Sequence, residues 1–220
     1  MTLTQIIGRF FLKHLAVPKN PKILPGKKLI ACIGDSITYG SGVGGKTEKT
    51  WEYFLNQQLG EEYQVLNYGI SGRTLQDEGD FPYRNDRFYP LSKKCGAETF
   101  LIMLGTNDTK PYNWDEARYE KELPVFVKEY LALPKNPSVI LMIPPKSFPY
   151  PGMQEVAFDI RNEEISGPLR RIVRKTAEEL KIPCIDLYAL TEERSDWFSD
   201  GVHPNEAGNR AIAAFIAGLL

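Results

Sequence analysis

The stretch 29-LIACIGDSIT-38 determines how the rest of the chain is interpreted, because an apolar run passes directly into a polar turn. Residues 29–34 are apolar or small throughout, which is typical of a short strand buried on both faces of a parallel sheet. Asp35, Ser36 and Thr38 follow where that strand should end. Ligands of open α/β sheets bind beyond the carboxyl ends of the strands, so this turn is a candidate site.

The same alternation continues along the chain. Apolar runs predict further strands at residues 63–70, 100–104, 139–143 and 184–187. Apolar residues at helical spacing predict helices at residues 51–59, 84–94, 116–133, 160–180 and 205–219. The helix at 116–133 should be kinked or split by Pro124. Short strands separated by helices favour a five-stranded parallel sheet covered on both faces, which is a three-layer α/β/α fold.

Length and composition narrow the class of protein. The 220 residues suffice for one α/β domain with a substantial core. Twenty-seven basic and 28 acidic residues leave a net charge of −1, so no bulk charge attracts nucleic acid or an anionic membrane. The sequence contains no run of about 18 apolar residues, so we predict no transmembrane helix. The scattered Cys32, Cys95 and Cys184, with only His14 and His203, lead us to expect no metal, no disulfide framework, no cofactor and a cytoplasmic location.

The first 26 residues are expected to be an addition to a domain at 27–220. Large apolar residues recur there at helical spacing: Leu3, Ile6, Ile7, Phe10, Phe11 and Leu15. Arg9, Lys13 and His14 interrupt them, which argues against an export signal, and a proline-rich linker follows. We expect an amphipathic helix that docks on a second copy to form a homodimer, on its own domain, or on a membrane surface.

Three more polar blocks follow expected strands or precede the last helix. They are 67-NYGISG-72, 105-GTND-108 and 200-DGVHP-204. Ser36 supplies a hydroxyl nucleophile, His203 can take its proton, and Asp200 can hold the second imidazole nitrogen. The backbone N–H groups of Ser36 and Gly72 and the side-chain amide of Asn107 can donate to an oxyanion. Together these residues predict an acyl-transfer site.

Structural roles for the same residue types remain as alternatives. Ser36 could cap a helix, Gly72 could form a tight turn, and Asn107 could bond its own backbone. Asp196 could hold the histidine in place of Asp200.

Four blocks in this order resemble the GDSL, or SGNH, hydrolase family: GDSIT at 34–38, NYGISG at 67–72, GTND at 105–108 and the Asp–His pair at 200–203. The resemblance covers nearly all of the domain but not the first 25 residues, and Ile37 stands where the family's name has leucine. It implies a flavodoxin-like fold, hydrolysis of an ester or thioester, and no metal. It also implies Ser36 as nucleophile, Gly72 and Asn107 as oxyanion donors, and Asp200 and His203 as the rest of a catalytic triad.

A second motif, GSGVGGKT at 40–47, fits the nucleotide-binding pattern GxxxxGK[ST]. A phosphate-binding loop opens almost directly from its strand, whereas residues 35–39 intervene here, and the expected helix begins only at Trp51. Nucleotide binding is therefore a distant alternative, and the glycines are expected to form a loop beside Ser36.

Aromatic residues after the third block bear on the substrate. Tyr112 and Trp114 are candidate substrate-binding residues, since their rings suit a sugar as well as an acyl chain. Asp35 is a further candidate, although we expect Asp35 and Asp108 chiefly to bond the surrounding loops. The last third of the chain is similar to family members that act on O-acetylated sugars, such as sialate and xylan acetylesterases. We expect first a serine esterase that removes acetyl groups from a small-molecule or oligosaccharide ester through an acyl-enzyme, and second a lysophospholipase, thioesterase or arylesterase.

Overall fold

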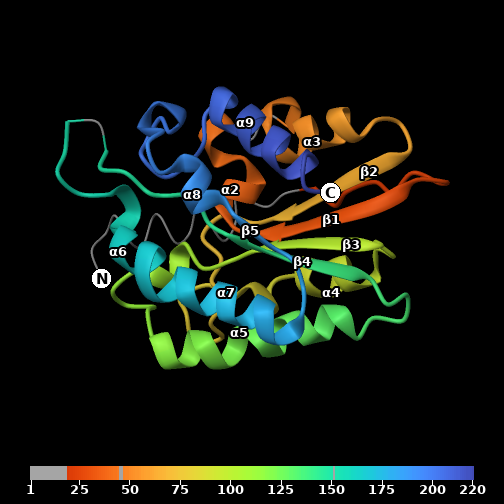
Figure 1. Ribbon diagram of the computed structural model, residues 1–220, viewed down its shortest axis with the longest axis horizontal. Coiled ribbons are helices and arrows are strands. Elements are labelled where there is room, and N and C mark those ends of the chain that lie inside the picture. Colours follow the sequence, from red (N-terminus) through yellow and green to blue (C-terminus); the bar gives the residue numbers. More distant parts are fainter. Residues whose placement is uncertain (1–18, 45–46, 151) are drawn as a thin grey trace.

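The computed structural model describes residues 19–44, 47–150 and 152–220, and a five-stranded parallel sheet lies at its centre (Figure 1). The strands are β1 (Lys28–Gly34), β2 (Tyr63–Gly69), β3 (Thr99–Met103), β4 (Ser138–Ile143) and β5 (Cys184–Asp186). Their order is β2-β1-β3-β4-β5, the flavodoxin-like order, with its switch point between β1 and β3. The predicted three-layer fold with a parallel sheet is therefore confirmed for the described part of the chain.

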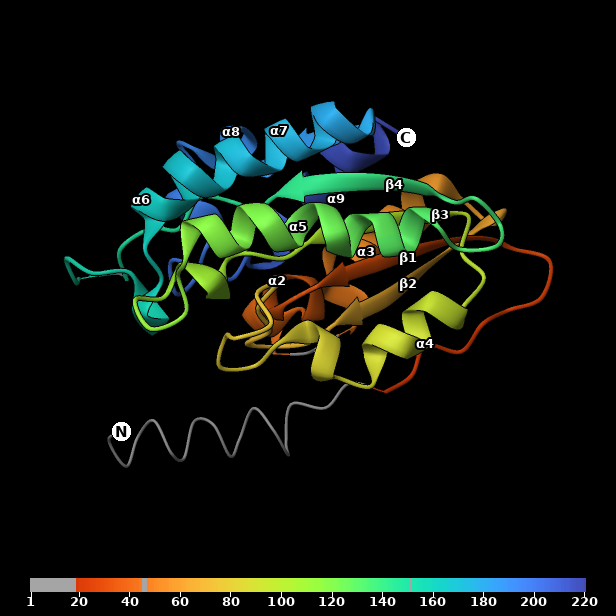
Figure 2. The same cartoon turned by 90° about the horizontal axis from the view of Figure 1, so that it is seen from below.

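Helices cover both faces of the sheet (Figure 1 and Figure 2). On one face lie α2 (Ser36–Tyr39), α3 (Trp51–Leu59), α8 (Leu187–Thr191) and α9 (Glu206–Ala217). On the other lie α4 (Phe88–Lys94), α5 (Glu116–Leu131), α6 (Asn162–Glu164) and α7 (Arg170–Leu180). Short 3-10 helices form at Ser41–Val43, Thr47–Lys49, Tyr83–Asn85, Asn107–Thr109, Ala157–Asp159 and Ser195–Trp197, and a π-helical turn forms at Ile165–Leu169. Successive side chains of β1 point alternately into the two layers, which explains why its whole run is apolar.

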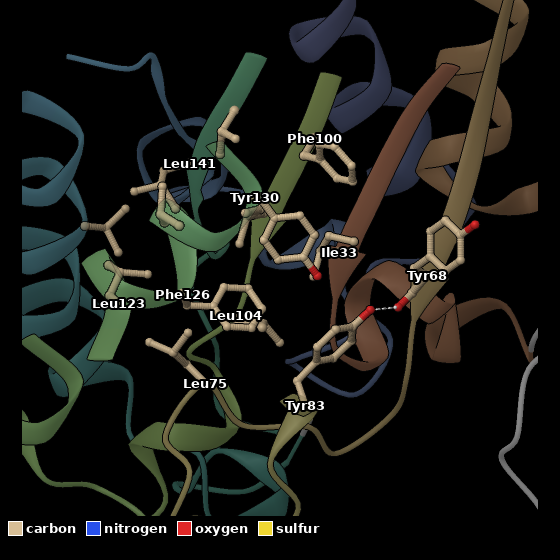
Figure 3. Close-up of a cluster of buried hydrophobic side chains, with 14 of the residues drawn as sticks. Ile33, Tyr68, Leu75, Tyr83, Phe100, Leu104, Leu123, Phe126, Tyr130 and Leu141 are labelled. Atoms are coloured by element: carbon tan, nitrogen blue, oxygen red, sulfur yellow. Dashed lines mark hydrogen bonds between the residues drawn. The ribbon is translucent and has the colours of Figure 1, made fainter. Parts of the chain in front are cut away.

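The core on the α5 side is rich in aromatic residues (Figure 3). Tyr83, Phe126 and Tyr130 are fully buried there. The ring of Phe100 on β3 lies with its centroid 4.9 Å from that of Tyr130. The Tyr83 hydroxyl donates a 2.8 Å hydrogen bond to the Tyr68 carbonyl near the end of β2. This bond ties the long segment after β2 back to the sheet.

Pro124 does not split the helix that contains it, because α5 runs without interruption from Glu116 to Leu131. One face of α5 is buried against the core through Tyr119, Leu123, Phe126, Val127 and Tyr130. The stabilisation from this packing outweighs the loss of the one backbone hydrogen bond that proline cannot donate.

Two expected helices differ from the structure: one is interrupted and the other is shorter. The helix expected at 160–180 begins at Asn162 and contains the π-helical turn, in which Pro168 lies. A proline ring clashes with the carbonyl one turn earlier in an α-helix, and the wider turn accommodates it. The helix expected at 84–94 is shortened to α4, because Asp86 is extended, with φ −95° and ψ 153°. Its carboxylate is drawn into an ion pair with Arg73, at 2.6 Å.

The amphipathic helix predicted near the start of the chain falls in residues 1–18, which lie outside the described residues, together with the docking expected of it. The linker that follows is held along the edge strand β2. Gln64 accepts the Leu24 N–H at 2.8 Å and donates to the Lys22 carbonyl at 2.7 Å. Within the described ranges, no helix is long and apolar enough to cross a bilayer.

We expect Tyr83→Phe to lower the free energy of unfolding by about 1–2 kcal/mol, because a buried hydrogen bond is lost and the Tyr68 carbonyl loses a partner. Tyr53→Phe is the matched control, since the Tyr53 hydroxyl accepts from Gln57 at the surface. Removal of the Tyr53 hydroxyl should change the free energy of unfolding by less than about 0.5 kcal/mol. Urea denaturation followed by fluorescence measures both, and equal values for the two variants would contradict this role of the Tyr83 hydroxyl.

Candidate active site

The carboxyl ends of three strands meet at the switch point of the sheet. The register places the last residues of β1, β2 and β3 side by side. The loops that leave these strands carry Ser36, Gly72 and Asn107, and the loop before α9 brings His203 to the same edge. The structure thus brings together the four polar blocks that are distant in the sequence.

A tight turn presents Ser36 at the start of α2. Asp35 caps this short helix by accepting a 2.9 Å hydrogen bond from the Ile37 N–H. A Cβ at Gly34 would lie 2.1 Å from Thr38 Oγ1, so only glycine lets the chain leave β1 in this way. The turn buries most of Ser36 and leaves 8% of its surface exposed.

Ser36, His203 and Asp200 form a continuous hydrogen-bonded series. His203 Nε2 lies 2.8 Å from Ser36 Oγ, and His203 Nδ1 lies 2.7 Å from Asp200 Oδ2. The other oxygen of Asp200 accepts the backbone N–H groups of Val202 and His203, at 2.9 and 2.7 Å. These bonds aim the carboxylate at Nδ1. With the ring proton on Nδ1, Nε2 is left to accept from the Ser36 hydroxyl.

Asp200 is ionised across the neutral range. Burial by itself would raise its pKa, but the hydrogen bonds from His203 and Val202 and the electrostatic attraction to the imidazole outweigh burial and lower the pKa to about 2. Asp196, the alternative partner, is bonded instead to Arg194 through both carboxylate oxygens, at 3.0 and 2.8 Å. The structure therefore places Asp200, and not Asp196, beside the histidine.

Gly72 and Asn107 lie on the loops after β2 and β3. Gly72 has a φ of 80°, a region that glycine adopts without strain. The side-chain amide nitrogen of Asn107 lies 3.3 Å from Asp35 Oδ2 and 3.2 Å from the Arg73 carbonyl oxygen. Asn113 donates to the Asn107 backbone carbonyl at 2.9 Å and steadies the turn. Both contacts of the Asn107 amide are long, so the amide can exchange them for a stronger acceptor.

Asp35 and Asp108 are buried and bond the surrounding loops. Asp108 accepts the N–H groups of Leu75 and Gln76 at 2.9 and 2.8 Å, which ties the loop after β2 to the turn after β3. Burial raises the pKa of Asp108 to about 7 although these two bonds lower it. Burial also raises the pKa of Asp35. With 1% of its surface exposed, Asp35 offers little area to a substrate.

The two aromatic residues that were expected to contact the substrate differ in their exposure to solvent. Tyr112 is 55% exposed. Trp114 is half-buried, with its ring centroid 5.5 Å from that of Tyr119 in the core. Tyr112 therefore presents surface to solvent, whereas the ring of Trp114 packs against the protein.

Two glycines support the His203 loop: Gly42, which was expected only to form a loop beside Ser36, and Gly201, for which no role was expected. Gly42, in the motif that resembles a P-loop, packs so closely that a Cβ would lie 2.2 Å from the Pro204 carbonyl oxygen. Gly201 has a φ of 82°, and a Cβ there would lie 2.2 Å from the Phe148 carbonyl oxygen. The Phe148 N–H also donates to the Gly201 carbonyl at 2.8 Å. The signal in the sequence was their position, within a few residues of the nucleophile and the base.

Two further side chains near the site carried no signal in the sequence. The ring centroid of Phe158 lies 5.3 Å from that of His203, and 55% of Phe158 is exposed. Lys110 is 6% exposed, and burial lowers the pKa of its ammonium although Asp80 and Asp35 raise it. Phe158 reaches the site through the packing of a distant loop, which local sequence does not encode, whereas Lys110 directly follows the turn that begins at Asn107.

The motif that resembles a P-loop is described only in part, because Lys46 lies outside the described residues. Its first glycines border the 3-10 turn Ser41–Val43, and Ser41 Oγ lies 3.0 Å from Ser71 Oγ. That contact joins the turn to the Gly72 loop. In the part of the chain that the structure describes, no three His, Cys, Asp or Glu side chains are grouped so that they could hold a metal ion.

Comparisons with known proteins all find esterases or acylhydrolases. Residues 32–211 match the sequence model of the GDSL-like Lipase/Acylhydrolase family. A curated relative from Xylanibacter ruminicola, named acetylxylan esterase, is 30% identical over 237 residues, which cover 99% of this chain and 47% of the relative. The chain thus spans about half the length of that relative.

Solved structures show the same architecture. The aryl esterase of M. smegmatis has a TM-score of 0.70 and 27% sequence identity, with 87% of this chain and 97% of that chain covered. A carbohydrate acetylesterase from Sinorhizobium meliloti has a TM-score of 0.66 and 23% identity, with 88% and 100% covered, and shares the fold.

We expect Gly201→Ala to lower kcat for p-nitrophenyl acetate by about 100-fold or more, because the added Cβ displaces the turn that carries Asp200 and His203. Gly44→Ala is the matched control. Gly44 also has a positive φ, of 64°, but no described atom would lie within 4 Å of its Cβ. It should leave kcat within about twofold, at a cost of about 1–2 kcal/mol in stability. Steady-state kinetics on variants checked by circular dichroism decide this, and equal losses of kcat would refute it.

Asp200 should stabilise the fold above pH 4 and cease to do so as the pH falls toward 2. Its pKa is lowered from 3.8 to about 2 in the folded state, so protonation favours unfolding in that window. The shift corresponds to about 2 kcal/mol. We expect the difference in unfolding free energy between wild type and Asp200→Asn to be largest above pH 5 and to shrink below pH 3. A difference that does not vary with pH would contradict this.

Proposed function

The chain belongs to the GDSL-like lipase/acylhydrolase family, and on that premise we propose that it is a serine esterase that removes acetyl groups from a carbohydrate. The observation that carries the proposal is the hydrogen-bonded series from Ser36 Oγ through both nitrogens of His203 to Asp200. This arrangement supplies a nucleophile, a base that can take its proton, and a carboxylate that holds the base.

In the first half of the proposed reaction, Ser36 Oγ attacks the carbonyl carbon of the ester while His203 Nε2 takes the hydroxyl proton. Asp200 stabilises the imidazolium that forms. The negative charge that develops on the carbonyl oxygen is stabilised by hydrogen bonds from the N–H groups of Ser36 and Gly72 and from the Asn107 amide. Each donor lowers the free energy of the transition state by about 3–4 kcal/mol. The bond to the alcohol oxygen then breaks, His203 passes its proton to that oxygen, and the acetyl group stays on Ser36.

In the second half, water releases the acetate. His203 Nε2 removes a proton from a water molecule as the water oxygen attacks the acetyl carbon. The same three donors stabilise the oxyanion of this second tetrahedral intermediate. When the intermediate collapses, the proton returns from His203 to Ser36 Oγ, and acetate leaves.

Two observations support a carbohydrate as the alcohol part of the substrate. The relative named acetylxylan esterase matches nearly the whole chain. Tyr112 is exposed in the loop that follows Asn107, and an aromatic face there suits a sugar ring. An aryl ester is the second candidate substrate, favoured by the similarity to the aryl esterase of known structure.

Substitution of the triad tests the mechanism. Ser36→Ala should abolish nearly all acetate release, because the three residues act as a unit, and Asp200→Asn should lower kcat by about 10⁴-fold. Ser41→Ala is the matched control, a neighbouring serine whose hydroxyl bonds Ser71, and it should stay within a few-fold of wild type. Retained activity in a folded Ser36→Ala variant would overturn the assignment.

An ester panel tests the substrate. Acetate release from acetylated xylo-oligosaccharides is compared with hydrolysis of phenyl acetate and of p-nitrophenyl octanoate. We expect the highest kcat/KM for the acetylated oligosaccharide. A higher value for phenyl acetate would favour the aryl ester, and a preference for octanoate would exclude both.

A further inference from the structure

The segment between β4 and α6, described at residues 144–150 and 152–161, projects beyond the body of the molecule (Figure 1), and its Phe158 lies beside His203. Three of its large apolar side chains are exposed: Tyr150, Met153 and Phe158. Of these, Phe158 has its ring centroid 5.3 Å from that of His203, with an angle of 62° between the ring planes. An exposed phenylalanine beside the base of an active site calls for a physical reason.

The backbone at this point is held in an unfavourable conformation. Phe158 and Asp159 have φ values of 64° and 59°, in the left-handed region where a side chain crowds the backbone. Two consecutive residues of this kind persist only where the surrounding structure imposes them, and such positions cluster at ligand-binding sites.

Contacts on both sides impose this conformation. Arg161, two residues after the strained pair, donates from Nε to the Thr109 carbonyl at 2.8 Å, in the turn that begins at Asn107. On the other side, Pro149 and Val156 form an antiparallel bridge that closes the projecting part. The segment is therefore fastened to the loop after β3 and closed on itself, and the chain between these points places Phe158 beside the ring of His203.

The ring of Phe158 lies beside the imidazole that, in the proposed mechanism, protonates the leaving alcohol. In the proposed mechanism, His203 gives its proton to the leaving alcohol oxygen, so a group that contacts the imidazole also borders the alcohol. In the same mechanism the acyl carbonyl oxygen is bound by other groups, at Ser36, Gly72 and Asn107. More than half of the surface of Phe158, 55%, is exposed and can meet that alcohol.

We propose that Phe158 forms a wall of the alcohol subsite and selects esters whose alcohol is a ring, such as a pyranose or a phenol, over small acyclic alcohols. This rests on the proposed serine esterase mechanism and specifies its substrate. A flat ring gains contact area and a favourable aromatic or CH–π geometry against phenylalanine. A methyl or ethyl alcohol is too small to cover the ring and gains little.

Acetate esters of different alcohols test this, because all of them form the same acetyl-enzyme and differ only in the alcohol. Phe158→Ala should lower kcat/KM about tenfold for phenyl acetate and for an acetylated xylopyranoside, and less than twofold for methyl acetate. Phe158→Asn should give the same pattern, since asparagine tolerates the left-handed backbone but lacks the ring. Met153→Ala, in the same segment, is the matched control and should leave all three substrates unchanged.

Three results decide the matter. Equal losses for methyl and phenyl acetate would overturn the proposal, because the ring would then act through His203. No loss for any ester would overturn it as well. A melting temperature of Phe158→Gly at or above that of wild type, with the same selective loss, would support it, because glycine relieves the backbone and removes only the ring.

The two proposals fail in different ways. If the acetylated sugar is not hydrolysed but the contrast between phenyl and methyl acetate depends on Phe158, the carbohydrate assignment falls and the alcohol subsite stands. If Ser36→Ala retains wild-type activity, the serine mechanism falls and the subsite with it.

Discussion

The turn from β1 into α2 is the constraint on which the rest of the site depends. Gly34 ends β1 so close to Thr38 and to the Met103 carbonyl that no side chain fits there. Asp35 then closes the turn with one oxygen on the Ile37 N–H. Its other oxygen contacts the Asn107 amide. One buried carboxyl thus caps the turn that carries Ser36 and also contacts the amide of Asn107.

Buried polar bonds hold the loops that complete the site. Arg73, next to Gly72, pairs with Asp86 at 2.6 Å and donates to the Ser71 carbonyl at 2.9 Å. Asp108 ties the same loop to the turn after β3. Such bonds are strong where water is excluded, and breaking one leaves a buried group without a partner. These bonds hold the loops in place in the absence of substrate, as the proposed stabilisation of an oxyanion requires.

The loop that carries His203 is supported by the loops that follow β1 and β4. Its turn lies between Gly42, after the nucleophile, and Phe148, after β4, and both contacts are too tight for a Cβ. The segment that carries Phe148 also carries Phe158 across the imidazole. Support of the His203 loop and the proposed alcohol subsite therefore share one stretch of chain, and a change in its length or path should alter both.

Local sequence determined the elements and the chemical groups. The apolar run of β1, the helical spacing of α3 and α9 and the four polar blocks were readable because each depends on neighbours within a few residues. The same holds for Ser36, Asn107 and His203, whose residue types define the chemistry that the strand ends can perform.

Only the tertiary structure decided the rest, because it depends on contacts between residues distant in the chain. The bonds from Asp108 to the backbone of Leu75 and Gln76 join residues more than 30 positions apart, so the local sequence could not indicate them. Pro124 favours a break in α5, but burial of one helical face overrides it. Phe158 looks like an ordinary loop residue, and it meets His203 because Arg161 is fastened to Thr109. Local preference is set by a few neighbouring residues, whereas these outcomes follow from packing across the whole fold.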